Sequence, residues 1–528
     1  GISHNKFIDL SVGTGNGLIF NNSMENGTSQ IGGHVTKNSN LTSNAKVILN
    51  EVTGNNVSNI NGDIEIFGAK ADFILANENG ITLNGATFIN TNGITLSTGK
   101  VSNIGNNINF DVQKGNIELN GVGTSGNYFN VLAKTVQIFK EISPLIGEHS
   151  PDISIIAGEN KLSTQVGKLN DINIVSSKKT TSDKYGIYAS EFGSMYGKNI
   201  KLISTDEGLG VKHEGLIVSE RDIAIDSNGD IVLTSVNSQG KLDIKGKSLT
   251  TKKGISRDKE NSFINSISAK DNIDLNISGN INLESALQST DGSIKIVAKN
   301  LTLADKTSAR IISKKNIVVN LSEKLDVQGV MIPTIPGKPN LDLIILVNDK
   351  DELQAKDIKS GTVYSSSEIA WVSTGIIGTQ VDLFAKEIEN KGLISADRNL
   401  KIDAKKILNH KSSVIKGANI DIKAKNSFIN RGEIRENQKE LNEFVDPLGN
   451  LKIEVSFGGF ENYGNISAQK ISILTQKLIN SFAGKVIATN GDIVLTTSVG
   501  ELINNGAVWA TPMRSRPSSK GGIVCSWM

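Results

Sequence analysis

Residues 77–98, NENGITLNGATFINTNGITLST, contain three short alternating runs, around 81–83, 88–89 and 94–96. Each run is bounded by Asn and Gly. Apolar and β-branched residues at every second position place one set of side chains on one face of a strand, and Asn-Gly is a strong turn signal. Strands this short are not stable alone. Each therefore needs a neighbour of the same kind.

A repeat of about 20 residues becomes visible after residue 234. Apolar pairs recur after 20 or 21 residues, Ile273 and Leu275 as Ile294 and Ile296, and Ile281 and Leu283 as Leu301 and Leu303. A period near 20 with two or three strand-length runs is typical of a β-solenoid, in which coils stack about 4.8 Å apart. No window shows a sustained 3.6-residue period, so helices should be nearly absent.

Asparagine recurs at one place in the later coils, in phrases such as IENKG, ILNHK, FINRG and LINSF. The recurring residues are Asn390, Asn409, Asn430, Asn462, Asn480 and Asn504. Asparagines at the same place in successive coils stack into a hydrogen-bonded ladder. We expect this ladder at a turn, where it would hold the register that a small apolar core cannot.

The composition restricts the classes of protein to consider. Aromatic residues are only 5%, which suits a narrow core lined with Ile, Leu and Val. Lys and Arg number 56 against 54 Asp and Glu, without a basic stripe, so no nucleic-acid partner is expected. No apolar run reaches the roughly 20 residues of a membrane helix. The single cysteine, Cys525, allows neither an intrachain disulfide nor a cysteine-based metal site.

A series of blocks follows one order in the first 234 residues. They are GISHNKF, GLIFNNS, NSNL, AKVILNEV, NGDIEIFGAKADFILANENGI, FINTNGITLSTGK, KGNIELNGVGTSGNYFNVLAKTVQI and FGSMYGKNIKLISTDEGLGVKHEGLI. In this order they resemble the secretion domain of two-partner secretion exoproteins, the filamentous-haemagglutinin family. The resemblance implies a right-handed parallel β-helix. It also implies recognition in the periplasm by a dedicated outer-membrane transporter, which passes the chain to the cell surface.

The resemblance places the candidate site in two signature turns. The residues expected to carry recognition by the transporter's periplasmic domains are Asn38, Ser39, Asn40, Leu41, Asn77, Glu78, Asn79, Gly80 and Ile81. Ser39 and Glu78 stand where the family usually has Pro, which removes a preset φ from each turn. Leu83 and Ala86 stand where some members have a pair of cysteines.

Interruptions of the repeat divide the chain into five predicted parts. PTIPGKPN at 333–340 holds three of the eight prolines, which belong outside a sheet. Insertions on one face of a solenoid often form its binding surface. The predicted parts are a two-partner secretion domain, a capped β-helix, at 1–235; β-helical repeats at 236–329; an extra-helical insertion containing Pro at 330–368; β-helical repeats at 369–510 with a smaller insertion near 431–450; and a non-repetitive tail at 511–528.

Motifs for chemistry are weak. Gly121, Gly123 and Gly126 spell G-x-G-x-x-G, but a strand-like run follows them, so we expect a turn between coils and no cofactor. The five histidines are far apart and none has a second ligand nearby in sequence, so we expect no metal site. Acidic residues mostly stand singly beside Lys, as on a solvated face, which argues against an enzyme. Trp371 leaves a sugar-stacking role open.

The predicted function is that of a non-enzymatic, adhesin-like exoprotein, secreted or held at the outer surface of a Gram-negative bacterium. It would bind a host-cell or bacterial receptor or glycan. One alternative is the stalk of a contact-dependent growth inhibition toxin that lacks its C-terminal toxin. Another is a β-helical polysaccharide-cleaving enzyme, which needs clustered carboxylates. The chain opens at Gly1 without a signal segment, so we interpret it as a mature or truncated product.

Overall fold

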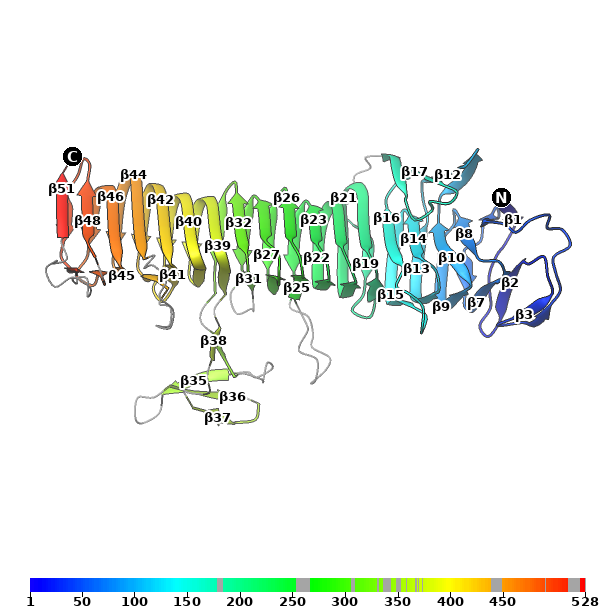
Figure 1. Ribbon diagram of the computed structural model, residues 1–528, viewed down its shortest axis with the longest axis horizontal. Coiled ribbons are helices and arrows are strands. Elements are labelled where there is room, and N and C mark those ends of the chain that lie inside the picture. The colour runs from blue at the N-terminus through cyan, green and yellow to red at the C-terminus, as the bar shows by residue number, and fades with distance from the viewer. Residues whose placement is uncertain are drawn as a thin grey trace. The chain divides into compact units, whose positions relative to one another are not determined.

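The computed structural model describes residues 1–177, 184–252, 266–304, 309–329, 332–335, 343–347, 353–357, 359–365, 368, 370–372, 374–437, 449–489, 491–510 and 523–527. The regular secondary structure in these residues consists of β-strands, and most of the strands pair in parallel (Figure 1). The predicted all-β, parallel β-helix is therefore confirmed. The described residues contain no helix that could cross a membrane.

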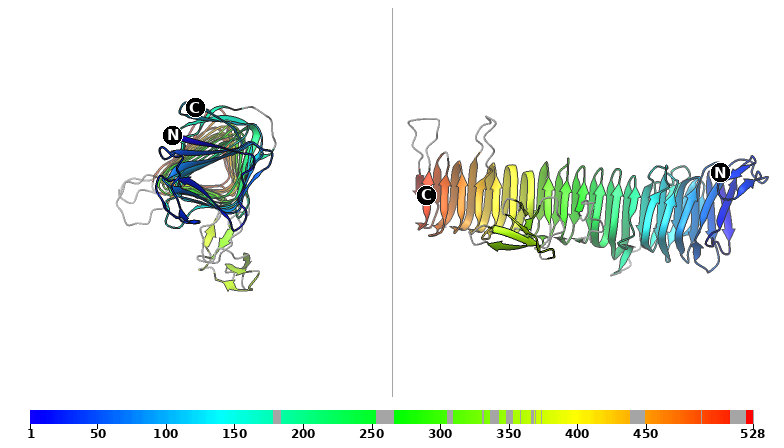
Figure 2. Two further views of the ribbon diagram at one scale, coloured as in Figure 1. Left: turned by 90° about the vertical axis from the view of Figure 1, so that its right-hand side faces the viewer. Right: turned by 90° about the horizontal axis from the view of Figure 1, so that it is seen from below.

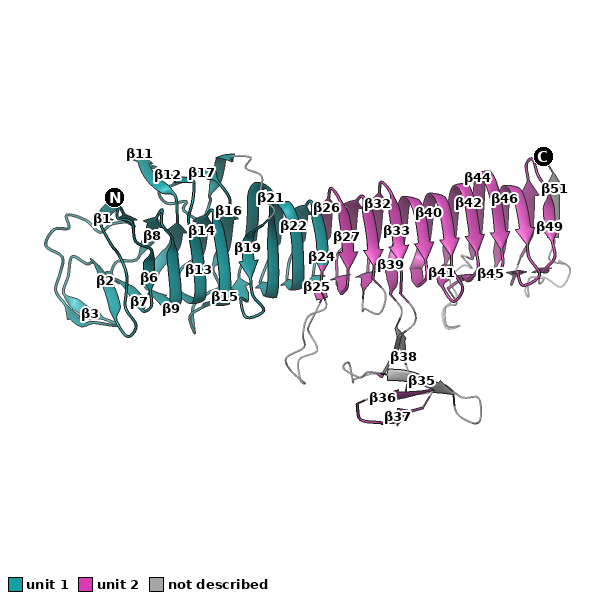
Figure 3. Cartoon of the chain, turned by 180° about the vertical axis from the view of Figure 1, so that it is seen from behind, with its two compact units in different colours: residues 1–250, 267–271 teal, residues 251–266, 272–528 magenta. Residues whose placement is uncertain are grey.

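The chain divides into two compact units (Figure 3). Unit 1 comprises residues 1–250 and 267–271, and unit 2 comprises residues 251–266 and 272–528. Within each unit the strands of successive coils lie side by side (Figure 2).

Unit 1 is built on parallel strands whose inward apolar residues stack from one coil to the next. Phe73 of one strand pairs with Ile94 of the next coil, for example. The stacked strands are β1 (Ile2–Phe7), β2 (Gly17–Asn22), β5 (Val47–Val52), β6 (Ser58–Ile60), β7 (Asp63–Gly68), β8 (Ala71–Asn77), β9 (Ile81–Ile89), β10 (Thr91–Ser97), β13 (Asn116–Thr124), β14 (Tyr128–Ala133), β15 (Thr135–Pro144), β16 (Asp152–Ala157), β19 (Tyr185–Ala189), β20 (Met195–Gly197), β21 (Ile200–Ser219), β22 (Ile223–Ser238) and β23 (Leu242–Gly246). At the limit of the unit are β24 (Ser248–Thr251) and β25 (Ser266–Ala269).

The stretch 77–98 forms two strands after its first turn, rather than three. The first two predicted runs join in β9, and the third lies in β10. Gly85 has a φ of 68° inside β9, so the Asn-Gly pair at 84–85 bends the strand without ending it. Glycine allows this because it has no Cβ.

A four-stranded antiparallel sheet lies outside the coils of unit 1. It consists of β11 (Lys100–Ile104), β12 (Asn107–Val112), β17 (Asn160–Gln165) and β18 (Asn173–Ser177). Phe110 and Leu162 of this sheet belong to one buried cluster with Ile74 and Leu132 of the coils. Both faces of β8 and β14 are therefore buried. A small antiparallel hairpin is formed by β3 (Gly27–Ser29) and β4 (Gly33–Val35).

Unit 2 contains the repeats in the register expected from the sequence. Ile273 pairs with Ile294, and Ile281 with Leu301. Its stacked strands are β26 (Ile273–Ile277), β27 (Asn280–Leu283), β28 (Ala286–Ser289), β29 (Ile294–Ala298), β30 (Asn300–Leu303), β31 (Arg310–Ser313), β32 (Asn316–Leu321), β33 (Lys324–Val327), β39 (Gly375–Asn390), β40 (Leu393–Asn409), β41 (Val414–Gly417), β42 (Asn419–Asn430), β43 (Glu433–Glu436), β44 (Asn450–Asn462), β45 (Asn465–Ala468), β46 (Lys470–Asn480), β47 (Lys485–Ala488), β48 (Ile493–Thr497), β49 (Leu502–Asn504), β50 (Ala507–Ala510) and β51 (Ile523–Trp527).

Two small sheets lie between β33 and β39 in the sequence and are separate from the stacked strands (Figure 1). One pairs β34 (Ile332–Thr334) with β38 (Ala370–Val372), and the other contains β35 (Leu343–Val347), β36 (Leu353–Asp357) and β37 (Val363–Tyr364). Much of the predicted insertion near 431–450 and of the tail at 511–528, and the side chain of Trp371, lie outside what the structure describes. The five-part division stays a prediction.

Candidate functional site

The first candidate turn is organised by Asn38. Its Oδ1 accepts a hydrogen bond from the backbone nitrogen of Asn40 at 3.1 Å, and its carbonyl accepts one from Leu41 at 3.2 Å. Its Nδ2 donates to the carbonyl of Asn21 in β2 at 2.9 Å. An asparagine that accepts from the backbone two residues later fixes an Asx turn, which needs no proline. Asn38 thus ties the turn to β2.

The second candidate turn has the same pattern. Oδ1 of Asn77 accepts from the backbone nitrogen of Asn79 at 3.0 Å, and its carbonyl accepts from Gly80 at 3.1 Å. Nδ2 of Asn77 donates to the carbonyl of Asn56 at 2.9 Å and to Oγ of Ser58 at 3.0 Å. The asparagine that opens each turn therefore binds both its own turn and an earlier segment.

The two turns differ in what they expose. Ser39 and Asn40 are exposed in the first, whereas Asn77, Gly80 and Ile81 are buried in the second. The remaining residues, Asn38, Leu41, Glu78 and Asn79, are partly buried. The resemblance assigned both turns, and among the described residues no hydrogen bond joins one to the other. Their role in recognition stays a prediction.

Gly80 closes the second turn in a conformation that suits glycine. Its φ is 123°, and a Cβ at this position would lie 2.9 Å from the carbonyl oxygen of Asn116. Nδ2 of Asn79 donates to the carbonyl of Gly54 at 2.8 Å, which fixes the turn on a further segment. The chain has little freedom to reshape this turn once the coil is closed.

Two structural anchors of the N-terminal coils were not singled out from the sequence. Glu65 is 3% exposed and accepts hydrogen bonds from Oγ of Ser29 at 2.6 Å and from two backbone nitrogens at 3.0 and 3.1 Å. It fixes the chain between β3 and β4. Asn22 is 2% exposed and binds the carbonyls of Ala45 and Ala69 at 3.0 and 2.9 Å. An acid within the apolar run IEIFGA was the available signal for Glu65.

The asparagine ladder of unit 2 is confirmed. Each Nδ2 donates to Oδ1 of the next asparagine, at 2.8, 2.8, 2.9, 2.9 and 2.8 Å along the series Asn390, Asn409, Asn430, Asn462, Asn480 and Asn504. The first five members are at most 1% exposed. Since buried amides are costly when unpaired, the ladder fixes the stacking register of these coils.

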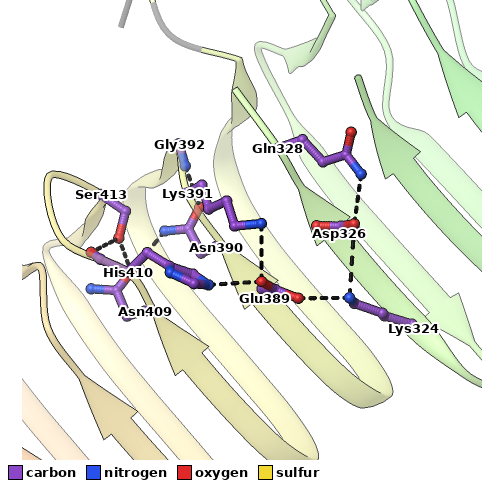
Figure 4. A network of polar contacts seen from close by, with 10 residues as sticks. All are labelled: Lys324, Asp326, Gln328, Glu389, Asn390, Lys391, Gly392, Asn409, His410 and Ser413. Atoms are coloured by element: carbon purple, nitrogen blue, oxygen red, sulfur yellow. Dashed lines mark hydrogen bonds and ion pairs between the residues drawn. The ribbon is translucent and has the colours of Figure 1, made fainter. Parts of the chain in front are cut away.

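An ion-pair cluster lies beside the start of the ladder (Figure 4). Glu389 contacts Nζ of Lys324 at 2.6 Å, Nζ of Lys391 at 3.1 Å and Nε2 of His410 at 2.7 Å. These groups lower the pKa of Glu389 to about 2, the hydrogen bond from Lys324 contributing most. The carboxylate therefore remains charged over the physiological range.

The other candidate groups have structural roles. Gly121 and Gly123 lie within β13, whereas Gly126 lies in the bend that joins β13 to β14. The predicted turn is therefore wrong for the first two glycines and present at the third. The φ of Gly121 is 96°, which bends β13 without ending it. His213 is fully buried, which lowers its pKa to about 4. Among the described residues, no three His, Cys, Asp or Glu side chains are grouped to hold a metal ion.

The family comparison decides the identity of the first part of the chain. The sequence model of the TPS secretion domain matches residues 1–233. These residues belong to the TPS secretion domain family. TPS denotes two-partner secretion, so the family resemblance of this region is confirmed.

Curated relatives extend over different shares of the chain. The "Filamentous hemagglutinin" of Bordetella pertussis is 40% identical over 250 residues, which cover 47% of this chain and 7% of that protein. The "Protein adenylyltransferase and cysteine protease IbpA" of Histophilus somni is 29% identical over 560 residues, 99% of this chain and 12% of that protein. The "16S rRNA endonuclease CdiA" of Enterobacter cloacae is 34% identical over 258 residues, which cover 47% of this chain and 7% of that protein. The chain thus spans 7–12% of the length of these relatives.

Two solved TPS domains are similar. The crystal structure of the filamentous hemagglutinin secretion domain is 36% identical, with a TM-score of 0.42, and covers 48% of this chain and 84% of that chain. The crystal structure of the HMW1 secretion domain from Haemophilus influenzae is 16% identical, with a TM-score of 0.30, and the match covers 99% of this chain and 92% of that chain.

Proposed function

We propose that this chain is an adhesin-like exoprotein that a partner outer-membrane transporter exports to the cell surface or the medium. The observation that carries the proposal is the TPS secretion domain at residues 1–233. Exoproteins of this class are secreted and surface-associated in Gram-negative bacteria. The relative named a filamentous hemagglutinin, which is 40% identical, supports an adhesive role.

The two asparagine turns are our candidates for recognition by the transporter's periplasmic domains. Ser39 and Asn40 are exposed, so the first turn is accessible in the folded domain. Asn77, Gly80 and Ile81 are buried. Their burial favours a model in which the transporter reads the second segment before its coil closes, while the chain is still unfolded in the periplasm.

The test measures export of the full chain, preceded by a signal peptide and co-expressed with its partner transporter. Asn40→Ala removes an exposed side chain, whereas Asn38→Ala and Asn77→Ala also remove turn hydrogen bonds. We expect all three variants to accumulate less protein in the medium. Asn106→Ala, at another exposed asparagine in unit 1, is the matched control and should be exported normally.

Two outcomes separate recognition from folding. Asn40→Ala should reduce export without lowering the melting temperature of the purified protein, because its side chain makes no hydrogen bond within the described chain. Asn77→Ala should lower both. Normal secretion of the Asn38→Ala and Asn40→Ala variants would remove the first turn from the recognition role.

A second candidate function is the stalk of a toxin-delivery protein. Relatives named as a 16S rRNA endonuclease CdiA and a tRNA nuclease CdiA match 47% of the chain at 34% identity. The test is whether the native reading frame continues past Met528 into a compact, non-repetitive domain beside a small immunity gene. A frame that does so favours the stalk, and one that does not favours the adhesin.

We further propose that residues 1–528 have no enzymatic activity of their own. The TPS domain is a secretion module, and the enzyme names of IbpA and CdiA apply to relatives far longer than this chain. Incubation with acidic and neutral polysaccharides tests the polysaccharide-cleaving alternative. Turnover that a single carboxylate substitution abolishes would overturn the proposal.

A further inference from the structure

Three charged side chains meet at one corner of unit 1, away from the two candidate turns. Nζ of Lys134 lies 2.5 Å from Oδ2 of Asp206 and 2.9 Å from Oε1 of Glu159. The side chain of Asp206 is 0% exposed, that of Glu159 14% and that of Lys134 24%. The lysine is therefore enclosed between two carboxyl groups, largely out of contact with water. We refer to these three residues as the lysine–carboxylate cluster.

The lysine–carboxylate cluster joins three successive coils. The strand β14 pairs with β16, and β16 pairs with β21, so these strands stack at the corner. Lys134 directly follows β14, Glu159 lies between β16 and β17, and Asp206 lies within β21. The stacking of the coils thus brings together three side chains that are far apart in the sequence.

The backbone of the corner holds the carboxyl group of Asp206 from the other side. Its Oδ1 accepts a hydrogen bond from the backbone nitrogen of Glu159 at 2.9 Å. Gly158 has a φ of 120°, and a Cβ at this position would lie 2.8 Å from the same oxygen. Glycine therefore leaves the space that the carboxyl group occupies. One oxygen of Asp206 is held by the backbone, and the other faces the amine of Lys134.

An ion pair on the surface of unit 2 has a different environment. Nζ of Lys386 and Oε1 of Glu323 lie 2.6 Å apart, but their side chains are 47% and 41% exposed. Water can solvate both of these charges. The carboxyl group of Asp206 has lost its water, and burial without solvent disfavours an ammonium and a carboxylate relative to the neutral amine and acid. The cluster is therefore better suited than the surface pair to a reaction between its groups.

We propose that the side chains of Lys134 and Asp206 become joined by an isopeptide bond, with Glu159 as the catalytic residue that carries the proton. Groups held in contact in the correct geometry react as if each were present at about 10⁵–10⁸ M. This effective concentration offsets the preference of dilute aqueous solution for the free amine and acid. The folded coils thus form the bond without a further enzyme or an energy source.

The reaction conserves charge and releases one water molecule. Burial lowers the pKa of the Lys134 ammonium, but its hydrogen bonds to Asp206 and Glu159 outweigh burial and raise the pKa, so the pair starts charged. One proton passes from Nζ through Glu159 to Oδ2 of Asp206, and the freed lone pair of Nζ forms a bond to Cγ. The backbone N–H of Glu159 stabilises the negative charge that develops on Oδ1. A second proton passes from Nζ to Oδ2, which leaves as water while the carbonyl reforms at Oδ1.

The bond closes a covalent loop across the coils. Lys134 and Asp206 are 72 residues apart, and β17 and β18 of the extra-helical sheet lie between them in the sequence. A cross-link that closes a long loop stabilises a fold by restricting the unfolded chain. The inference goes beyond the proposed function and does not depend on it, because the bond forms in any folded copy of unit 1.

The test measures the mass of the purified full chain under denaturing conditions. We expect the wild type to be lighter than the mass of its sequence by one water molecule. Trypsin no longer cleaves after a lysine whose amine is acylated. Digestion should therefore yield a branched peptide in which residues 115–140 are joined to residues 202–212.

Three variants test the roles of the residues. Lys134→Arg keeps a positive charge, but the guanidinium stays protonated and does not attack, so this variant should have its full sequence mass. Glu159→Gln keeps the backbone N–H and removes the proton carrier. Its rate of cross-linking, followed by mass after cell-free synthesis, should be at least about tenfold lower than that of the wild type. Lys386→Arg, at the exposed ion pair, is the matched control and should still lose one water molecule.

Two results would overturn the inference. One is folded wild-type chain that has its full sequence mass, a measurement that does not depend on the folding of any variant. The other is a loss of water that persists in Lys134→Arg, because it would indicate a cyclised aspartate elsewhere in the chain. An unchanged rate in Glu159→Gln, with a circular dichroism spectrum equal to that of the wild type, would overturn the catalytic role of Glu159.

Discussion

Replacing Asn409 in the middle of the asparagine ladder tests whether the ladder holds the register of unit 2. Asn409 is 0% exposed, receives a hydrogen bond from Asn390 at 2.8 Å and donates one to Asn430 at 2.8 Å. Asn409→Ala leaves Oδ1 of Asn430 and, in part, Nδ2 of Asn390 without partners. A buried unsatisfied polar group costs about 1–3 kcal/mol, so the two together predict a loss of about 3 kcal/mol.

The assay is native-state hydrogen exchange of the full chain, which reports the opening free energy of each coil separately. This matters because stacked repeats need not unfold as one cooperative unit. Amides of β40 and β42 should exchange faster, while those of unit 1 should be unchanged. Asn280→Ala is the matched control, since it removes an exposed Asn–Asn bond of 2.9 Å and should cost less than about 0.5 kcal/mol.

A loss below about 1 kcal/mol for Asn409→Ala would refute the reasoning, because it would mean that water or a shift of the coil satisfies both amides at little cost. Equal effects of Asn409→Ala and Asn280→Ala would refute it as well. Burial of the asparagines would then make no difference to the stability that their hydrogen bonds contribute.

Three further predictions concern single residues. Gly80→Ala should destabilise unit 1 by about 1–3 kcal/mol in thermal unfolding, whereas Gly147→Ala, also at positive φ but with nothing within 4 Å, should cost less. The pKa of Glu389 is about 2 in the folded protein, against an ordinary value of 4.5, so the stability that its charge contributes is present above pH 4.5 and lost as the pH falls toward 2. Glu389→Gln should therefore lower the free energy of unfolding by about 1–2 kcal/mol at pH 7, after allowance for solvent screening. The pKa of His213 is about 4 in the folded protein, against an ordinary value of 6.5, so the unfolded chain takes up a proton first as the pH falls. The free energy of unfolding should therefore decrease by up to about 3 kcal/mol between pH 6.5 and pH 4. His213→Leu should lack this pH dependence in urea unfolding, and a slope equal to that of the wild type would contradict it.

The sequence predicted features that repeat at a fixed interval. Ile273 and Ile294 were assigned to the same place in neighbouring coils because the period is visible along the chain, and they pair as expected. The ladder followed from the same logic. These features could be predicted because stacking brings together residues one period apart, without further information.

Features that depend on distant partners could not be predicted in this way. Residues 107–112 alternate as a coil strand would, yet β12 pairs with β17 outside the coils. The ion pair between Lys386 and Glu323 could not be predicted either, because the two residues lie 63 positions apart, across the segment between β33 and β39. The Asn-Gly pair at 84–85 predicts the end of a strand, but the positive φ of Gly85 bends β9 without ending it.

The asparagine ladder has a consequence for how such a chain can change in length. Its successive members are separated by 19, 21, 32, 18 and 24 residues, yet the amide contacts stay between 2.8 and 2.9 Å. Each coil of this region contributes one asparagine to the ladder, whatever the number of residues between two successive members. Insertions and deletions in the connections between ladder positions can therefore be fixed in evolution without repacking the core. The same connections are natural places to graft foreign peptides for display.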